Sequence, residues 1–247
     1  MTCSHWTVQP KFGEHCLTFI LGASGSGKSN FIKHILLERE YHFEPSKIET
    51  IVYVYSSVDE HLDALKKEIP GIHLVKELPQ DWKTKWARPG SIIVFDDQET
   101  KFNSSKSYSD QMNELATIFV HHLKLWVFVL LQTYDILYKR HRLNPSIHQL
   151  TCLVLFRANK IDVSLKRFLN TFNVTLRDKR TLYDVFGEYT RVHPHSYIIV
   201  FIGPDQETAQ VYSNVLLSDG MNLLTLHDDE LHFWKCLLNT GVLTQKE

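Results

Sequence analysis

The sequence lacks the features that would place it in a membrane or in a secretory pathway. No apolar run approaches the ~18–20 residues that a membrane helix needs, since the longest candidate, residues 125–131, has seven. The first residues, MTCSHW, contain neither the charged start nor the apolar stretch of a signal peptide. We therefore expect no membrane association.

Neither one sign of charge nor cysteine is in excess. Lys plus Arg number 27 and Asp plus Glu number 28, a formal net charge of −1, so net charge neither indicates nor excludes a nucleic-acid partner. The four cysteines are widely spaced and form no CxxC pair. This pattern is typical of reduced thiols in an intracellular protein. Hydrophobic residues at 43% and charged residues at 22% exclude disorder, collagen and coiled coil as the main state.

Short apolar runs alternate with helical patterns along the chain. Strands are expected at 15–21, 51–55, 72–75, 91–95, 125–131, 151–156 and 197–202. Helices are expected at 28–40, 59–69, 111–123, from an N-cap at Asp162 onward, and at 178–189, with an amphipathic tail at 228–238. The Trp-containing stretch 80–89 and the Ser- and Lys-rich stretch 101–109 predict loops, the second one mobile.

Uniformly apolar strands interleaved with helices predict an α/β fold, with a mostly parallel sheet and helices on both faces. The sequence contains no internal repeat and no Gly/Pro-rich linker. We therefore expect one domain over residues 1–247, with a core at about 15–203 and a C-terminal extension at about 204–247.

A glycine-rich phosphate-binding motif lies between an expected strand and an expected helix. The pattern G-x-x-x-x-G-K-S/T is matched without a gap by Gly22, Ala23, Ser24, Gly25, Ser26, Gly27, Lys28 and Ser29. Its glycines let successive backbone N–H groups turn toward one anion, and the helix N-terminus adds its positive end. Lys28 would neutralise β/γ-phosphate charge, and the small hydroxyl of Ser29 could ligate Mg²⁺. The motif predicts ATP and Mg²⁺ as ligands.

Two further polar groups follow apolar strands. The run Ile92-Ile93-Val94-Phe95 ends in Asp96 and Asp97, and Gln132 follows the apolar run 126–131. The first acid, Asp96, is expected to hold the Mg²⁺ shell. Asp97 is expected to polarise a water for attack on the γ-phosphate. Gln132 is expected to report on the γ-phosphate or to place that water.

The histidines do not favour a metal site. His121 and His122 are adjacent, so they diverge on a helix. His193 and His195 could converge on a strand, but no third ligand accompanies them.

A phosphate-loop strand, an acidic pair on a second strand and a polar residue on a third together resemble the additional-strand P-loop NTPases, and within them the FtsK/HerA superfamily. The segments VFVLLQT (127–133) and LVLFR (153–157) resemble DNA-packaging ATPases of double-stranded DNA viruses. The segments ANK (158–160), LKRFLNTF (165–172), GPD (203–205) and SDG (218–220) are most similar to adenovirus-type packaging ATPases, with poxvirus-type and polinton-type next. One departure is Asp97, where the superfamily usually has Glu.

The resemblance implies an ATP-driven motor that moves double-stranded DNA into a viral capsid. It implies a homo-oligomeric ring with ATP between subunits, and capsid or portal vertex proteins as further partners. It also implies an arginine from the neighbouring subunit, for which Arg157 leads over Arg140, Arg142 and Arg167. The basic run 139–142 could instead face DNA phosphate, act as a weak nuclear signal or be a solvated loop. The implied location is an infected host cell, chiefly its nucleus, with possible association with the virion.

Two other classes of function fit the motifs less well. One is another P-loop enzyme, such as a helicase or a small-molecule kinase. A kinase would need a lid of clustered arginines, and an acidic pair with a sensor glutamine argues against it. The other is a DNA-binding or scaffold protein that keeps the nucleotide fold but hydrolyses slowly, which the Asp97 departure would allow.

Overall fold

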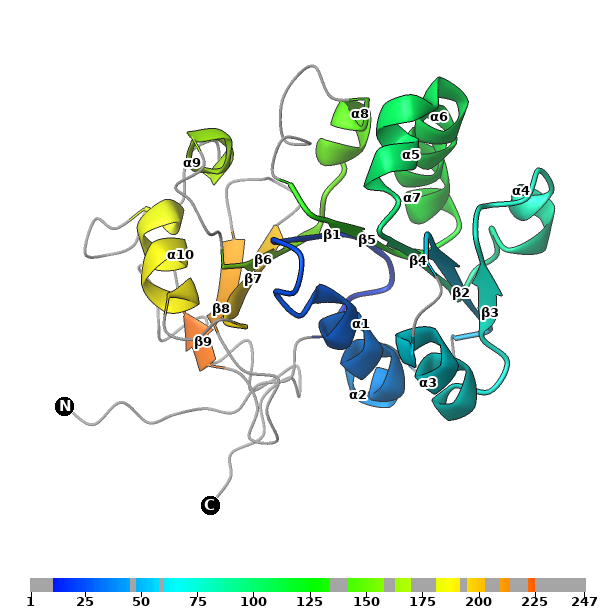
Figure 1. Cartoon of the computed structure of the whole chain (residues 1–247), viewed down its shortest axis with the longest axis horizontal. Helices are drawn as coiled ribbons and strands as arrows, with labels where there is room; N and C mark the ends of the chain where they lie inside the picture. The colour runs from blue at the N-terminus through cyan, green and yellow to red at the C-terminus, as the bar shows by residue number, and fades with distance from the viewer. Residues whose placement is uncertain are drawn as a thin grey trace.

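A nine-stranded sheet forms the centre of the computed structural model (Figure 1), with strand order β3-β2-β4-β5-β1-β6-β7-β8-β9. The structure describes residues 11–44, 48–57, 60–133, 142–157, 163–169, 181–191, 195–202, 209–213 and 222–224. The strands are β1 (Cys16–Leu21), β2 (Thr50–Tyr55), β3 (His73–Val75), β4 (Ser91–Asp96), β5 (Trp126–Leu131), β6 (Cys152–Phe156), β7 (Tyr197–Ile202), β8 (Ala209–Ser213) and β9 (Asn222–Leu224). In this spatial order, neighbouring strands are parallel from β3 to β6, a part of the sheet that also contains β2, β4, β5 and β1. From β6 to β9, neighbouring strands are antiparallel.

Helices cover both faces of the sheet, as the apolar strands predict. The helical segments are α1 (Lys28–Leu37), α2 (Arg39–His42), α3 (Glu60–Glu68), α4 (Trp82–Lys85), α5 (Glu99–Ser104), α6 (Lys106–Glu114), the π-helical turn η2 (Leu115–Phe119), α7 (Val120–His122), α8 (Asn144–Ile147), α9 (Val163–Leu169) and α10 (Leu182–Thr190). Helices α1 to α3 lie on one face and α5 to α8 on the other (Figure 1). Alternate residues of β1 join different cores: Phe19 packs with the α5–α6 side, whereas Ile20 packs with α1 and α3. Every residue of β1, β5 and β6 is buried, which is typical of strands covered on both faces.

Two expected loops are helical instead. The Ser- and Lys-rich stretch 101–109 forms parts of α5 and α6, so the prediction of a mobile loop was wrong. The many Ser and Lys residues gave no sign of two features that favour helices. The rings of Phe102 and Tyr108 stack with centroids 5.2 Å apart. Ser105 is an N-cap whose side chain accepts a hydrogen bond from the Tyr108 N–H. The stretch 80–89 likewise contains α4, because Trp82 is buried against the sheet rather than exposed in a loop.

The sheet also continues past the expected end of the core at residue 203. Strands β8 and β9 extend it in antiparallel order through residue 224, although β7 was expected to be the last clear strand. Their short, partly polar sequences, AQVYS and NLL, give little periodic signal. The helix expected at 178–189 begins at Leu182, since Thr181 forms a capping box with Asp184. The N-cap expected at Asp162 and the tail 228–238 lie outside the described residues.

Strand order brings the expected site residues to one edge of the sheet. β5 lies between β1 and β4, with Leu21 opposite Leu131 and Phe95 opposite Val129. Because these strands are parallel, the phosphate loop, the acidic pair and Gln132 all follow carboxyl ends at the same edge. An extra strand between the phosphate-loop strand and the acidic strand is the arrangement expected for the additional-strand division. Within the described residues, no helix combines the length and apolarity needed to cross a membrane.

Candidate functional site

The phosphate loop owes its shape to particular glycines. Gly27 is the N-cap of α1 with φ of 104°, and Gly25 has φ of 74°, so both have left-handed backbone that favours glycine. Gly22 is required for a different reason: a Cβ there would lie 2.6 Å from Cβ of Phe156 on β6. The tight approach of the loop to β6 therefore excludes any side chain at position 22.

Lys28 is held against the loop that precedes it. Its Nζ donates hydrogen bonds to the carbonyl oxygens of Gly22 at 2.6 Å and Ala23 at 2.9 Å. Burial lowers the pKa of Lys28, and the charges of Asp96, Asp97 and Glu99 oppose that shift. A buried cation with nearby carboxylates and carbonyl oxygens is suited to exchange these contacts for phosphate oxygens.

Ser29 and Asp96 converge as the sequence predicts for a metal site. The Ser29 hydroxyl donates to Oδ2 of Asp96 at 3.0 Å, and the hydroxyl of Tyr53 donates to the same oxygen at 2.6 Å. Tyr53 lies on β2 and is completely buried. Its role was missed, because nothing in the sequence marks one tyrosine of the run Ile51-Val52-Tyr53-Val54-Tyr55 as a partner of an acid 43 positions away.

This pair of oxygens fits Mg²⁺ bound together with phosphate. Mg²⁺ prefers hard oxygen ligands and is usually held by one or two carboxylates with substrate phosphates. In the described part of the chain, no three His, Cys, Asp or Glu side chains cluster to form a self-sufficient metal site. Ser29 and Asp96 would therefore hold Mg²⁺ only when phosphate oxygens complete the shell.

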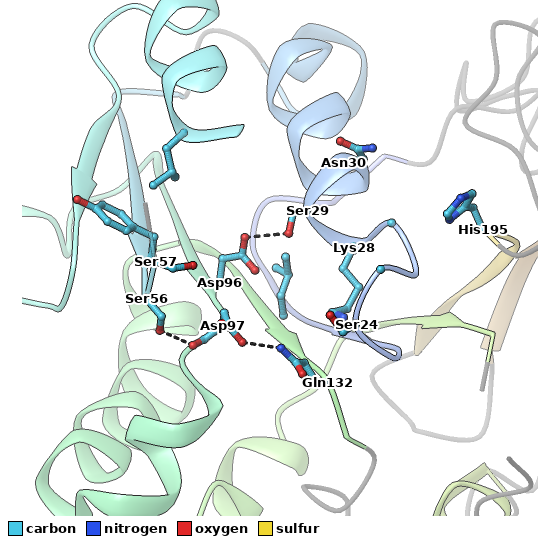
Figure 2. A pocket seen from close by; sticks show the side chains of 15 residues that line it. Ser24, Lys28, Ser29, Asn30, Ser56, Ser57, Asp96, Asp97, Gln132 and His195 are labelled. Carbon is cyan, nitrogen blue, oxygen red and sulfur yellow. Dashed lines mark hydrogen bonds between the residues drawn. The ribbon is translucent and has the colours of Figure 1, made fainter. Parts of the chain in front are cut away.

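Asp97 is fixed by its backbone and by its side chain. It has φ of 55°, a left-handed conformation that Asp adopts more readily than most residues. The Ser56 hydroxyl donates to its carbonyl oxygen, and Gln132 Nε2 donates to its Oδ1 at 2.7 Å. Figure 2 shows these two contacts converging on Asp97 from Ser56, which follows β2, and from Gln132, which follows β5. The structure thus brings the two residues predicted to handle the attacking water into direct contact.

Gln98 anchors the turn that carries Asp97. The side chain is fully buried, and its Nε2 donates to the Ser56 hydroxyl at 2.9 Å and to the Asp96 carbonyl oxygen at 3.3 Å. Its Oε1 accepts from the Tyr108 hydroxyl at 3.0 Å. Sequence reasoning missed this residue as well, since a glutamine after two acids is typical of a solvated turn.

A cavity of about 400 Å³ opens between these groups. It is lined by Ser24, Gly25, Gly27, Lys28, Ser29, Asn30, Tyr55, Ser56, Ser57, Leu62, Asp96, Asp97, Leu130, Gln132 and His195. Lys28 lies between Asp97 and Gln132 on one side and His195 on the other (Figure 2). His195 Nδ1 lies 3.2 Å from the Ser26 carbonyl oxygen, so this histidine contacts the phosphate loop directly.

The other histidines considered as metal ligands lie elsewhere or are not described. His121 Nδ1 lies 3.0 Å from Nε2 of His15. Burial, and then the charge of His121, lowers the pKa of His15. His193 lies outside the described residues.

The structure places the candidate arginines only in part. Arg157 follows β6 at the same sheet edge as the phosphate loop. Its backbone N–H donates a hydrogen bond to the Ser196 carbonyl oxygen at 3.2 Å. β1 lies between β6 and the sensor strand β5, and Arg157 does not line the cavity. Arg142 is exposed, whereas Arg140 and the side chain of Arg167 lie outside the described part of the structure. The assignment of an arginine finger stays a prediction.

Comparison with known proteins identifies the fold. The genome packaging NTPase B204 from Sulfolobus turreted icosahedral virus 2, in complex with ATPγS, is similar with a TM-score of 0.53 and 12% identity, over 83% of this chain and 100% of that chain. The DNA-packaging ATPase B204 from Sulfolobus turreted icosahedral virus gives 0.50 and 13%, over 81% and 98%. The cytoplasmic domain of the Thermomonospora curvata type VII secretion ATPase EccC gives 0.52 and 13%, over 86% of this chain and 26% of that chain.

The chain has the fold of a P-loop NTPase. This confirms the fold class predicted from the sequence. The chain matches no protein-family model and no curated protein. Because the identities are 12–13%, these likenesses establish the fold alone. The closer similarity to adenovirus-type packaging ATPases stays a prediction.

Proposed function

We propose that this protein is an ATP hydrolase of the FtsK/HerA type that translocates double-stranded DNA into a viral capsid. One observation carries the hydrolase part of the proposal. Side chains from β4, α1 and the end of β5 converge on one cavity in the arrangement that ATP hydrolysis requires. These side chains are Lys28, Ser29, Asp96, Asp97 and Gln132.

Each group has a defined task in that reaction. The N–H groups of the phosphate loop and Lys28 bind the β- and γ-phosphates, and Mg²⁺ would supply Lewis-acid stabilisation of the phosphate oxygens at Ser29 and Asp96. Asp97 accepts a proton from water while the water oxygen bonds to the γ-phosphorus. The bond from that phosphorus to the β–γ bridging oxygen breaks, which releases ADP and phosphate. Since a carboxylate has two oxygens, Asp97 can do this while Gln132 remains bound to Oδ1.

The orientation of the nucleotide follows from the positions of the ends of the cavity. Asp97 and Gln132 lie on one side of Lys28 and His195 lies on the other (Figure 2). With the γ-phosphate at Asp97 and Gln132, we propose that the nucleoside lies on the His195 side of the cavity. His195 is therefore the described residue best placed to contact the base or the ribose.

The cavity itself contains no arginine among the described residues that line it. Lys28 is the one Lys or Arg side chain among the described residues that line this cavity. We therefore propose that a neighbouring subunit of a homo-oligomeric ring supplies an arginine that stabilises transition-state charge on the γ-phosphate, with Arg157 first among the candidates. Such fingers are worth about 10³–10⁵ in rate in other NTPases.

The motor part of the proposal draws on the sequence resemblance to viral packaging ATPases and on what the similar structures are. Two of them are genome- or DNA-packaging NTPases of viruses. Under this proposal, double-stranded DNA binds along the ring axis through Lys and Arg contacts to phosphate, with little reading of bases. Capsid or portal vertex proteins are further partners, and the protein acts in an infected host cell, chiefly in the nucleus.

The experiment that tests the proposal is an ATPase assay with and without duplex DNA, on the wild type and on Lys28→Ala. We expect turnover that rises with added duplex and falls steeply as salt increases, and no turnover in Lys28→Ala. Turnover stimulated by a small-molecule acceptor instead of DNA would favour a kinase. Duplex binding with no turnover in either protein would favour a DNA-binding scaffold.

A further inference from the structure

Glu99 bridges two consecutive residues at the end of the sensor strand. The residue opens α5, three positions after Asp96. Its Oε2 accepts a hydrogen bond from the backbone N–H of Gln132 at 2.9 Å, and its Oε1 accepts one from the hydroxyl of Thr133. Both oxygens of one carboxylate are therefore used to hold the chain where it leaves β5.

Gln132 takes part both in this bridge and in the contact with Asp97. The Gln132 backbone is held by Glu99 while its side chain donates to Asp97 Oδ1 at 2.7 Å. Leu131 is the last residue of β5, so the sheet no longer fixes the Gln132 N–H. Without Glu99, the Gln132 N–H would lose this acceptor, and the side chain could rotate away from Asp97.

The residue before Glu99 is held by several hydrogen bonds. Gln98, next to Glu99, is fully buried and bonds to Ser56 and Tyr108. The backbone that carries Glu99 is therefore held in place by the buried side chain of Gln98, although Glu99 itself is only partly buried. A carboxylate whose backbone is held in place can set the position of the residue that it binds.

We propose that Glu99 is a positioning residue that holds Gln132 at the distance from Asp97 needed to orient the attacking water. The inference rests on the proposed ATPase function and adds to it a residue outside the phosphate loop and the acidic pair. Glu99 acts through Gln132 and takes no proton from the water itself.

Two substitutions separate positioning from proton transfer. Glu99→Gln keeps both contacts, because its amide oxygen can accept from the Gln132 N–H and its NH₂ can donate to the Thr133 hydroxyl. Glu99→Ala removes both. We expect Glu99→Ala to lower kcat by about 10–100-fold with KM for ATP unchanged, and Glu99→Gln to keep most of the wild-type kcat. If both variants lose activity equally, the reaction requires the charge or the basicity of the Glu99 carboxylate rather than its two contacts, and the proposal is overturned.

A double-mutant cycle tests whether the effect passes through Gln132. In a Gln132→Ala background, we expect Glu99→Ala to cause no further loss of kcat, because the side chain that it positions is already absent. Additive losses would overturn the proposal. Glu68→Gln is the matched control for a change of charge, since Glu68 pairs with Lys33 on α1 at 3.2 Å and does not line the cavity.

Hydrogen exchange measures the contact without relying on turnover. We expect the Gln132 amide to exchange faster in Glu99→Ala than in the wild type and Glu99→Gln. Unchanged exchange in Glu99→Ala would overturn the proposal, as would faster exchange with an unchanged kcat. A wild type that never hydrolyses ATP would overturn the proposed function and this inference together, whereas an active wild type matched by Glu99→Ala would overturn the inference alone.

Discussion

Gln132 donates a hydrogen bond from Nε2 to Oδ1 of Asp97 at 2.7 Å, joining the ends of two neighbouring strands. The contact fixes one oxygen of the carboxylate and leaves the pair positioned at one end of the cavity. Removing the negative charge while keeping this geometry is therefore the cleanest test of Asp97.

Asp97→Asn is expected to bind ATP as the wild type does and to lose hydrolysis by about 10²–10⁴-fold. Asn is nearly the same size as Asp, tolerates the left-handed backbone and leaves Ser29 and Asp96 intact. Binding of a fluorescent ATP analogue and phosphate release, measured on the same preparation, check the two halves. Normal turnover in Asp97→Asn would assign the water to Gln132 or another group.

Asp97→Glu tests why this chain has Asp where the resembled superfamily usually has Glu. At φ of 55°, Glu lacks the short polar side chain that makes the left-handed region accessible. We expect the variant to lose about 1 kcal/mol of unfolding free energy and to gain no activity. Denaturant unfolding and turnover check this. A faster and equally stable Asp97→Glu protein would mean that the backbone conformation at position 97 does not favour Asp over Glu.

Tyr53→Phe tests the hydroxyl that donates to Asp96. The ring is fully buried, so Phe fills the same space and lacks the hydroxyl that makes the 2.6 Å hydrogen bond to Asp96. We expect the Mg²⁺ concentration for half-maximal turnover to rise about 10-fold, with saturating turnover little changed. A Mg²⁺ titration of ATPase activity measures it. Tyr41→Phe, at an exposed ring, is the control, and an unshifted titration for Tyr53→Phe would remove Tyr53 from the metal site.

Complementation between subunits tests the arginine finger. Lys28→Ala and Arg157→Ala proteins are each expected to be inactive alone, and their mixture is expected to recover part of the wild-type turnover. Recovery follows because one interface of the mixed ring combines an intact Lys28 with an intact Arg157. Arg142→Ala, a variant of another candidate arginine that is exposed, is mixed with Lys28→Ala in the same way, and the turnover recovered by the two mixtures is compared. If no arginine variant is rescued in such mixtures, the site is completed within one subunit.

Much of the site could be predicted because its residues come from short local motifs. Gly22 to Ser29, the acidic pair and Gln132 each follow an apolar strand, and parallel pairing of β1, β4 and β5 brings them to one edge. The fold class followed from the same alternation of buried strands and helices.

The supporting residues could not be predicted, because their partners lie far away in the sequence. Tyr53 and Asp96 are 43 positions apart, and Glu99 and Gln132 are 33 apart. Such pairs leave no periodic signal. The stretch 101–109 failed for another reason: its Ser and Lys residues indicated a loop, whereas burial of Phe102 and the cap at Ser105 favour helices.

The most direct test of the proposed function is ATP-driven displacement of a third strand from a triplex on linear duplex DNA. A protein that moves along duplex DNA strips such a strand, whereas an ATPase that merely binds DNA does not. We predict displacement by the wild type that requires ATP hydrolysis and Mg²⁺, and none by Lys28→Ala or Asp97→Asn. DNA-stimulated hydrolysis by the wild type without any displacement would contradict the proposal that this protein is a double-stranded DNA translocase.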